Sequence, residues 1–335
     1  MGSGIRMEDA KIGVVVHTDL RDWLFTPADL DRLKALGDVR MTESAEPITD
    51  DEACALLAGC AVGIGSWSTP GPTPDLLERC PDLKLWVHAA GSVRHFVSNV
   101  PEERDLVIAS CAPAIAGCVA EMAVGEIIVG LKRLLENAAA NRRGRAQRSE
   151  SSRTVFSSTV GVVGASQVGR RVIELLKPFG CPILLYDPFV SQDEADAIGV
   201  ELTRDLRHLC ARSHAVTLHT PLLDSTRGMI GEAELKAMRD DAVLVNTARG
   251  RCIDEEALVE ELRKGRLLAF LDVTSPEPAA DDSPLRSLPN VVLTAHIAGG
   301  RDPAIGRQAV DDVAAFLSGG TPAMVVTKDM LDRVA

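Results

Sequence analysis

Residues 159–187 constrain the fold of this chain more than any other segment. The apolar run Val160–Val163 is typical of a buried strand, and residues 164–169, with the sequence GASQVG, follow it directly. A segment with apolar residues at helical spacing comes next and stops at Gly180, a residue that tolerates the left-handed conformation. A second apolar strand, Ile183–Tyr186, follows, and Asp187 comes directly after it. Strand, glycine turn, helix, strand and acid follow one another in the order of a dinucleotide-binding βαβ unit.

The residue types in the turn fit the chemistry of such a unit. Gly164 permits the tight turn, Gly169 lets the helix pack closely on the strand, and the N–H groups at the helix N-terminus face a pyrophosphate. Asp187 would accept hydrogen bonds from ribose hydroxyls and repel a 2′-phosphate, which favours NAD over NADP. Ser166 stands where the motif usually has its second glycine, and we interpret it as a tolerated variant. This segment therefore predicts that NAD binds to Gly164, Ser166, Gln167, Val168, Gly169 and Asp187.

Length and composition limit the classes of protein to consider. A chain of 335 residues suggests about two domains, and its net charge of -12 disfavours nucleic acid and anionic membranes as partners. No apolar run approaches the ~18–20 residues of a membrane span, so we expect no membrane insertion. The 8 cysteines form no C-x-x-C pair and no Cys/His cluster at metal spacing. These features predict a cytoplasmic protein without a metal site that acts on a small molecule.

Strands alternate with helices on both sides of the glycine turn. Before it we expect strands over Lys11–His17, Ala61–Ser66, Leu83–Ala89 and Leu106–Ala109, and helices over Pro27–Leu36, Thr49–Ala58 and Pro74–Cys80. After it we expect strands over Ala215–His219, Ala242–Asn246, Leu267–Leu271 and Val291–Thr294, and helices over Glu232–Met238, Asp254–Lys264 and Ile305–Leu317. A long apolar helix, Glu121–Asn141, lies between the two halves. Such alternation predicts parallel sheets and hence an α/β protein.

Polar residues follow several of these strands, at the ends where open parallel sheets bind ligands. They are Asp187, His219, Thr220, Arg249, Asp272 and His296. Arg249 could bind a carboxylate with both prongs of its guanidinium, although a surface arginine in an ion pair is the alternative. His296 could exchange a proton with a substrate oxygen, although histidines at such positions are more often satisfied core residues. A contact with Glu277 would favour the catalytic role, because a carboxylate fixes the imidazole tautomer.

Four motifs then occur in a fixed order: LHTPL at 218–222, NTARG at 246–250, LDV followed by EP at 271–278, and LTAHIAG at 293–299. With these motifs the chain resembles the D-isomer-specific 2-hydroxyacid dehydrogenases, from about Lys11 to its end. The resemblance implies that Arg249, Glu277 and His296 form the catalytic group. It also implies that the cofactor site extends over Thr220, Pro221, Thr247, Ala248, Arg249, Asp272, His296 and Ala298.

The resemblance further implies two doubly wound parallel-sheet domains with a cleft between them. Residues 7–117, completed by 299–335, would form a flavodoxin-like substrate domain, and residues 118–298 a Rossmann NAD-binding domain. The loop Ala90–Val93 matches the family's substrate loop. The substrate carboxylate would therefore bind to Gly91, Ser92, Val93 and Arg249. The family is usually dimeric through its cofactor domain and the long helix, which implies a homodimer.

We therefore expect reversible hydride transfer between NADH and C2 of a small 2-oxo acid of the glyoxylate or hydroxypyruvate kind. Two alternatives remain open. The first is a related enzyme with another reductant, in which Arg94 could favour an extra anion such as a phosphate. The second is an NAD-sensing protein like the family's transcriptional corepressors. The chain departs from the family pattern at Ser166, at Ala295 and at Thr274, and none of these departures removes a catalytic group.

Overall fold

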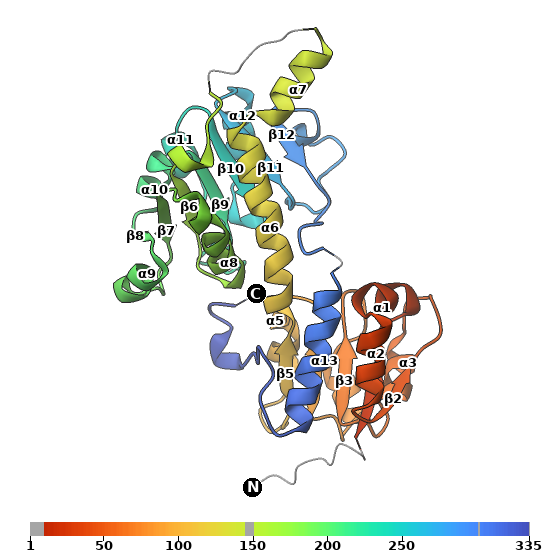
Figure 1. Ribbon diagram of the computed structural model, residues 1–335. Helices are drawn as coiled ribbons and strands as arrows, with labels where there is room; N and C mark the ends of the chain where they lie inside the picture. The colour runs from red at the N-terminus through yellow and green to blue at the C-terminus, as the bar shows by residue number, and fades with distance from the viewer. Residues whose placement is uncertain (1–9, 145–150, 301, 335) are drawn as a thin grey trace. The chain divides into compact units, whose positions relative to one another are not determined.

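The computed structural model describes residues 10–144, 151–300 and 302–334, and the chain forms two compact units. Unit 1 comprises residues 1–115 and 300–335, and unit 2 comprises residues 116–299. The predicted domain boundaries, after residues 117 and 298, lie near these limits, and the substrate and cofactor roles of the two domains stay predictions. Each unit is built on a parallel sheet, which confirms the predicted α/β fold class (Figure 1).

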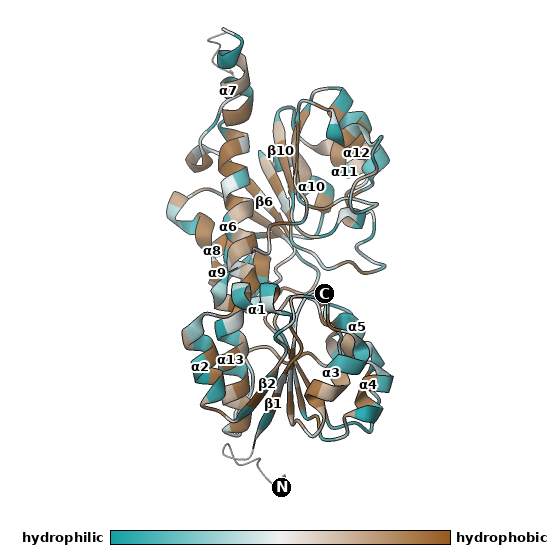
Figure 2. Ribbon diagram, turned by 90° about the vertical axis from the view of Figure 1, so that its right-hand side faces the viewer, coloured by the Kyte–Doolittle hydropathy of each residue, from teal (hydrophilic) through white to brown (hydrophobic). Residues whose placement is uncertain are grey.

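The sheet of unit 1 has five parallel strands in the order β2-β1-β3-β4-β5. These strands are β1 (Lys11–Val14), β2 (Asp38–Met41), β3 (Val62–Gly65), β4 (Leu85–His88) and β5 (Val107–Ser110). One face of the sheet is covered by α3 (Asp50–Leu57), α4 (Pro74–Arg79) and α5 (Arg94–Asn99). The other face is covered by α1 (Thr18–Leu24), α2 (Pro27–Lys34) and α13 (Pro303–Leu317), which returns from the far end of the sequence (Figure 2).

The sheet of unit 2 has seven parallel strands in the order β12-β11-β10-β9-β6-β7-β8. These strands are β6 (Val160–Val163), β7 (Ile183–Tyr186), β8 (Glu201–Thr203), β9 (Ala215–Leu218), β10 (Ala242–Asn246), β11 (Leu267–Leu271) and β12 (Val291–Leu293). One face carries α6 (Ala112–Leu131), α8 (Gln167–Leu176) and α9 (Gln192–Ile198). The other carries α10 (Leu206–Arg212), α11 (Glu232–Ala237) and α12 (Glu255–Arg263). The strand order reverses between β6 and β9, and doubly wound sheets bind ligands at such a switch point.

Burial on both faces explains the continuous apolar sequences of the strands. In β6, Val160 and Val162 pack in the core beneath α6 and α8, whereas Val163 packs in the core beneath α10 and α11. Because successive side chains of a strand point to opposite faces, one short run of valines serves two cores. Complete burial of each such side chain is worth roughly 1.5–3 kcal/mol. Figure 2 shows the resulting hydrophobic strands in the middle of each unit.

The long helix corrects one prediction. The sequence predicts one helix over Glu121–Asn141, but α6 begins at Ala112 and ends at Leu131, and a separate helix, α7, spans Leu134–Arg142. The break lies at Arg133, whose φ of 51° is in the left-handed region. The guanidinium of Arg133 is buried and donates a hydrogen bond to the main-chain oxygen of Asp241. A buried charge needs such a partner, and this tertiary contact holds the chain out of the helical conformation.

The same helix corrects the expectation that no apolar stretch approaches a membrane span. By length and composition alone, α6 is long and apolar enough to cross a membrane. More than half of its apolar window is buried in the structure, and the core helices of soluble proteins meet the same criterion. Ala120, Ala123 and Ile127 pack on the sheet of unit 2, so this contact accounts for the apolar composition of the helix.

Six short elements were not predicted: α1, β2, α5, α9, β8 and α10. Each has 3 to 7 residues, and such runs carry little periodicity.

Two predicted helix ends agree with the structure. Asp254 accepts a hydrogen bond from the Ala257 N–H at the start of α12, as its predicted N-cap role requires. Gly180 has a φ of 61° at the end of the segment that follows α8.

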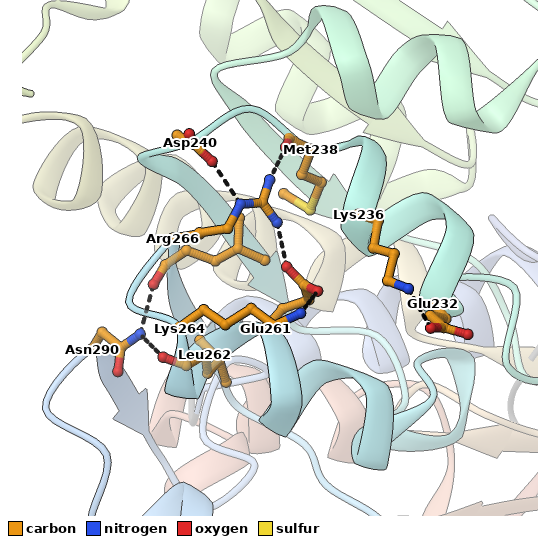
Figure 3. A network of polar contacts seen from close by, with 10 residues as sticks. Glu232, Lys236, Met238, Asp240, Glu261, Leu262, Lys264, Arg266 and Asn290 are labelled. Carbon is orange, nitrogen blue, oxygen red and sulfur yellow. Dashed lines mark hydrogen bonds and ion pairs between the residues drawn. The ribbon is translucent and has the colours of Figure 1, made fainter.

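A polar network joins the amino-terminal ends of β10, β11 and β12 in unit 2 (Figure 3). Arg266 donates hydrogen bonds to Asp240, to the main-chain oxygen of Met238 and to Glu261. The Glu261 side chain is only 3% exposed. Burial would raise the pKa of Glu261, but hydrogen bonds from Lys264 and Arg266 outweigh burial and hold that pKa below its ordinary value. This network lies at the edge of the sheet opposite to the predicted cofactor residues.

Candidate active site

The predicted cofactor and catalytic residues of unit 2 all follow strands of its sheet. Residues 164–169 follow β6, Asp187 follows β7, Thr220 and Pro221 follow β9, Thr247, Ala248 and Arg249 follow β10, Asp272 and Glu277 follow β11, and His296 and Ala298 follow β12. Because parallel strands end at a common edge, residues that are distant in sequence lie along one edge of the sheet. The loop Gly91–Val93 follows β4 in unit 1 in the same way.

Close packing requires glycine at two positions of the turn after β6. Gly164 has a φ of 95°, and a Cβ atom there would lie 2.8 Å from Cγ2 of Thr220. A Cβ atom on Gly169 would lie 2.0 Å from the main-chain oxygen of Gly164, so α8 could not approach the turn. Ser166 is the N-cap residue of α8, and its hydroxyl accepts a hydrogen bond from the Gly169 N–H at 3.4 Å. Helix capping gives a physical reason for a serine at this position.

The carboxylate of Asp187 is bound to the glycine turn. One oxygen accepts a hydrogen bond from the Ala165 N–H at 2.7 Å, and the other accepts from the Phe189 N–H at 2.8 Å and from the Val190 N–H at 3.3 Å. A carboxylate offers about four acceptor sites, so one remains for a ribose hydroxyl. The backbone contacts fix the direction of the acid before a ligand binds.

The edge of the sheet fits an NAD molecule. Among the hydrogen bonds in the described residues, none uses the N–H groups of Gln167 or Val168 at the start of α8, so both remain for a pyrophosphate. The hydroxyl oxygen of Thr247 is buried and has no partner in the described part of the chain. An orphaned buried hydroxyl costs free energy unless a ligand satisfies it. Together with the glycine turn and Asp187, these groups match the phosphates and hydroxyls of a dinucleotide.

His219, one of the polar residues noted at the strand ends, is buried rather than exposed to a ligand. It packs beneath the glycine turn, where its Cβ lies 3.4 Å from the position of a Cβ on Gly169. Burial lowers the pKa of His219 to about 3, so the ring is neutral, and its Nε2 contacts the Thr217 hydroxyl at 2.9 Å. We therefore assign His219 a packing role.

Arg249 sits in a turn that the sequence motif explains. The Asn246 side chain accepts a hydrogen bond from the Ala248 N–H and donates one to the main-chain oxygen of Arg249, both at 3.1 Å. The guanidinium of Arg249 donates to the main-chain oxygen of Ala248 at 2.7 Å and is only partly buried. Most of its five donors therefore remain for a ligand. Asn246 is a supporting residue that sequence reasoning quoted in a motif but did not single out.

Glu277 and His296 are in direct contact. The Glu277 Oε1 atom lies 2.5 Å from Nδ1 of His296, and both side chains are partly exposed. The contact leaves Nε2 of His296 as the ring nitrogen available to a ligand. His296 has a φ of 54°, in the left-handed region that few residues other than glycine adopt. Such strain persists only where the surrounding structure holds it.

Asp272 holds the turn that carries His296. Its buried carboxylate accepts hydrogen bonds from the Thr294 hydroxyl at 2.6 Å, the Ile297 N–H at 2.8 Å and the Ala298 N–H at 2.9 Å. Its main-chain oxygen accepts from the His296 N–H at 2.8 Å. These four contacts over-determine the strained conformation of the histidine. The structure therefore gives Asp272 a supporting role in addition to the predicted contact with the cofactor.

Glu126 on α6 is an acidic residue that sequence reasoning missed. Its side chain is buried, and Oε2 has no hydrogen-bond partner among the described residues. Burial, followed by the negative charge of Asp272, raises the pKa of Glu126 to about 8. The side chain is therefore largely a neutral carboxylic acid at pH 7. Glu126 lies in an apolar helical segment, and nothing in that sequence indicates that its side chain is buried near Asp272. No sequence signal could therefore have identified it.

The loop after β4 in unit 1 has free backbone donors. No hydrogen bond between described residues uses the N–H groups of Gly91, Ser92 or Val93. Three successive free N–H groups suit an anionic oxygen. Arg94 follows them, and it donates a hydrogen bond to the main-chain oxygen of Leu331. This bond uses one of the five donors of the guanidinium, so an anion such as a phosphate could still bind to the others.

In the described part of the chain, no group of three or more His, Cys, Asp or Glu side chains could hold a metal ion. Seven of the 8 cysteines are buried. The predicted absence of a metal site stays a prediction.

Comparison with known proteins identifies the family. Residues 124–298 match the family model described as D-isomer specific 2-hydroxyacid dehydrogenase, NAD binding domain. The chain belongs to the D-isomer-specific 2-hydroxyacid dehydrogenases. Membership confirms the resemblance drawn from the four motifs, and it confirms NAD as the cofactor of unit 2. The individual site residues stay predictions, supported by the geometry above.

Relatives within this family differ in length and in name. A D-3-phosphoglycerate dehydrogenase of Methanocaldococcus jannaschii is 32% identical over 272 residues, covering 81% of this chain and 52% of the relative. A glyoxylate reductase of Thermococcus litoralis is 30% identical over 269 residues, covering 77% of this chain and 81% of the relative. The crystal structure of the TT0316 protein from Thermus thermophilus is 27% identical with a TM-score of 0.75, covering 95% of this chain and 100% of that chain. The chain spans about half the length of several curated relatives that it matches.

Proposed function

We propose that this 2-hydroxyacid dehydrogenase homologue is an NAD-dependent oxidoreductase that interconverts a small 2-oxo acid and the corresponding D-2-hydroxy acid. The contact of 2.5 Å between Glu277 and His296 carries the proposal. A histidine whose one ring nitrogen is held by a carboxylate presents the other to a reacting oxygen, which is the arrangement of a general acid–base. An NAD-binding fold without such a pair would support cofactor binding alone.

The residues of the chain supply the proton and the substrate contacts. When bound, NADH supplies a hydride to C2. Protonated His296 gives its Nε2 proton to the carbonyl oxygen, so the C=O bond becomes C–OH and the imidazole becomes neutral. Glu277 stabilises the imidazolium and fixes the ring. In the reverse direction His296 takes the hydroxyl proton. General acid catalysis of this kind is worth ~10²–10⁴ in rate.

We assign recognition of the substrate carboxylate to two groups of donors. Arg249 has a planar guanidinium whose free donors can bind a carboxylate in two-pronged fashion and polarise the C2 carbonyl. The N–H groups of Gly91, Ser92 and Val93 have no partner within the described chain and suit the same carboxylate. The Arg249 guanidinium and the backbone N–H groups could each bind an anion separately. We propose that both bind the carboxylate of the same substrate molecule.

We propose a glyoxylate- or hydroxypyruvate-like acid as the substrate. The Thermococcus litoralis relative, which is 30% identical and matched over 81% of its length, is named a glyoxylate reductase. We further expect a cytoplasmic homodimer that binds neither nucleic acid nor membranes, which light scattering and cell fractionation would test.

The first experiment follows NADH consumption by the purified protein with glyoxylate, hydroxypyruvate, pyruvate, 2-oxoglutarate and longer 2-oxo acids. Turnover of one acid by the wild type, and its loss in His296→Gln, supports the proposal. We expect kcat to fall ~10²–10⁴-fold in this variant while the Kd for NADH stays within twofold. His208→Gln, at an exposed histidine of the same unit, is the matched control and should keep full activity. Tight NADH binding without turnover of any acid would refute the enzyme and favour an NAD-sensing protein.

A further inference from the structure

Ser110 connects the predicted substrate loop to the rest of unit 1. It is the last residue of β5, and its side chain is 1% exposed. Its hydroxyl donates a hydrogen bond to the main-chain oxygen of Gly91 at 2.5 Å and lies 3.4 Å from that of Ala90. The same hydroxyl accepts a hydrogen bond from the Ala112 N–H at 3.1 Å. The hydroxyl therefore acts both as a donor and as an acceptor, and these two hydrogen bonds fix its orientation.

This hydroxyl controls a peptide group that faces the proposed substrate. In a trans peptide the C=O and N–H bonds point in opposite directions across a rigid plane. Holding the oxygen of Gly91 on one side therefore directs the N–H of Ser92 to the other side. A hydrogen bond to the oxygen also polarises the peptide and makes its N–H a better donor. The Ser92 N–H has no other partner among the described residues.

A buried chain of polar contacts fixes Ser110 in turn. Gln308 on α13 donates from Nε2 to the main-chain oxygen of Ser110 at 3.1 Å and to Asp312 at 3.3 Å. Its Oε1 accepts from the Ala114 N–H at 2.8 Å, in the first turn of α6. The buried carboxylate of Asp312 also accepts from the Ala323 N–H at 2.6 Å. The returning helix thus holds the end of β5 and, through the Ser110 hydroxyl, the loop after β4.

We propose that Ser110 is a positioning residue for substrate recognition, and that Gln308 keeps it in place. The hydroxyl of Ser110 sets the plane of the peptide between Gly91 and Ser92, so that the Ser92 N–H is directed at the substrate carboxylate. This role rests on the proposed function, which gives the loop that carboxylate. It adds a residue outside the four sequence motifs, and it gives the C-terminal helix a part in binding the substrate.

Steady-state kinetics of Ser110→Ala test the role. Removing a donor that binds the ground state and the transition state equally raises KM without changing kcat. We expect KM for the 2-oxo acid to rise about tenfold, which corresponds to ~1.4 kcal/mol, while kcat stays within twofold. The Kd for NADH should not change. Ser110→Thr keeps a hydroxyl and should recover most of the affinity. Ser98→Ala is the matched control, because its exposed hydroxyl binds only the main-chain oxygen of Arg94.

The outcomes separate this inference from the proposed function. An unchanged KM in Ser110→Ala, or a parallel loss of kcat and NADH affinity, overturns the positioning role. If Ser110→Ala does not fold, Ser110→Cys keeps the volume with a poor donor, and the same rise in KM is expected. If the wild type turns over no acid, the proposed function fails by itself. The inference is then decided by the affinity of the NADH complex for oxamate: weaker binding in Ser110→Ala supports it, and equal binding overturns it.

Discussion

Replacing Glu126 with glutamine should stabilise unit 2 at high pH and leave it almost unchanged at low pH. The carboxyl of Glu126 is buried without a partner for Oε2 within the described residues, beside the charge of Asp272. Its pKa is raised from an ordinary value of 4.5 to about 8 in the folded chain. Between these two values the folded chain binds a proton that the unfolded chain has lost. The stability that this proton contributes is complete below pH 4.5 and disappears as the pH rises through 8.

The magnitude follows from the linkage between proton binding and folding. Each pH unit in which the folded chain holds one extra proton changes the free energy of unfolding by about 1.4 kcal/mol. From pH 5.5 to pH 8.5 the wild type should therefore lose about 3 kcal/mol through Glu126. Glutamine has almost the same shape and no charge, so Glu126→Gln loses none of it. In a unit of this size, about 3 kcal/mol corresponds to a difference of ~6–12 °C in Tm.

Scanning calorimetry at pH 5.5, 7.0 and 8.5 measures this difference. The chain has 3 tryptophans, Trp23, Trp67 and Trp86, which all lie in unit 1, so tryptophan fluorescence would report on the wrong unit. The quantity to plot is the Tm of Glu126→Gln minus that of the wild type at each pH, because other titrating groups cancel. Glu121→Gln, at an exposed position of the same helix, is the control. A difference that does not grow with pH would refute the account of Glu126 as a buried neutral acid.

Three further substitutions test other parts of unit 2. Gly169→Ala should weaken NADH binding at least tenfold in a fluorescence titration, because the new Cβ would lie 2.0 Å from the main-chain oxygen of Gly164; an unchanged Kd would contradict the close packing. Asp272→Asn should lower kcat about tenfold, because an amide offers one acceptor oxygen to the three donors now bound there, and wild-type kcat would contradict its role in holding the turn. Glu261→Ala should lower the free energy of unfolding in urea by about 2 kcal/mol, because it removes the buried carboxylate that accepts from Lys264 and Arg266, and a change below 1 kcal/mol would contradict the importance of the network.

Local sequence patterns predicted the elements that form the centre of each sheet. The strand at Ile183–Tyr186 matches its predicted limits, and the turn at residues 164–169 lies where the strand, glycine and helix pattern placed it. Buried parallel strands give continuous apolar runs, and glycines mark positions that no side chain can occupy. The same sequence patterns did not predict β2 and β8, which lie at sheet edges. The sequences of these two edge strands, DVRM and ELT, are short and contain charged residues, so they lack the apolar run.

The features that escaped prediction depend on contacts between distant residues. The break before α7 follows from the buried contact of Arg133 with Asp241, and the raised pKa of Glu126 follows from burial and Asp272. Gln308 reaches Ser110 across almost two hundred residues of sequence. The motifs named Arg249, Glu277 and His296 as the reacting group. The residues that hold such groups in place are of common types in no recognisable motif, so the sequence does not single them out. Sequence patterns therefore name candidates for the reacting groups, which stay predictions, but they do not name the residues that support those groups.

The anchoring of Asp187 has a consequence for how the cofactor preference could evolve. The oxygen that accepts from the Ala165 N–H belongs to the same carboxylate that would repel a 2′-phosphate. A substitution that admits NADP by removing this charge leaves at most one acceptor oxygen, so the N–H of Ala165 or those of Phe189 and Val190 would lose their partner. Acceptance of the new cofactor would therefore need a second change that supplies another acceptor for the N–H groups left without one. Natural drift and laboratory selection should both reach an NADP-dependent form through paired mutations rather than through one.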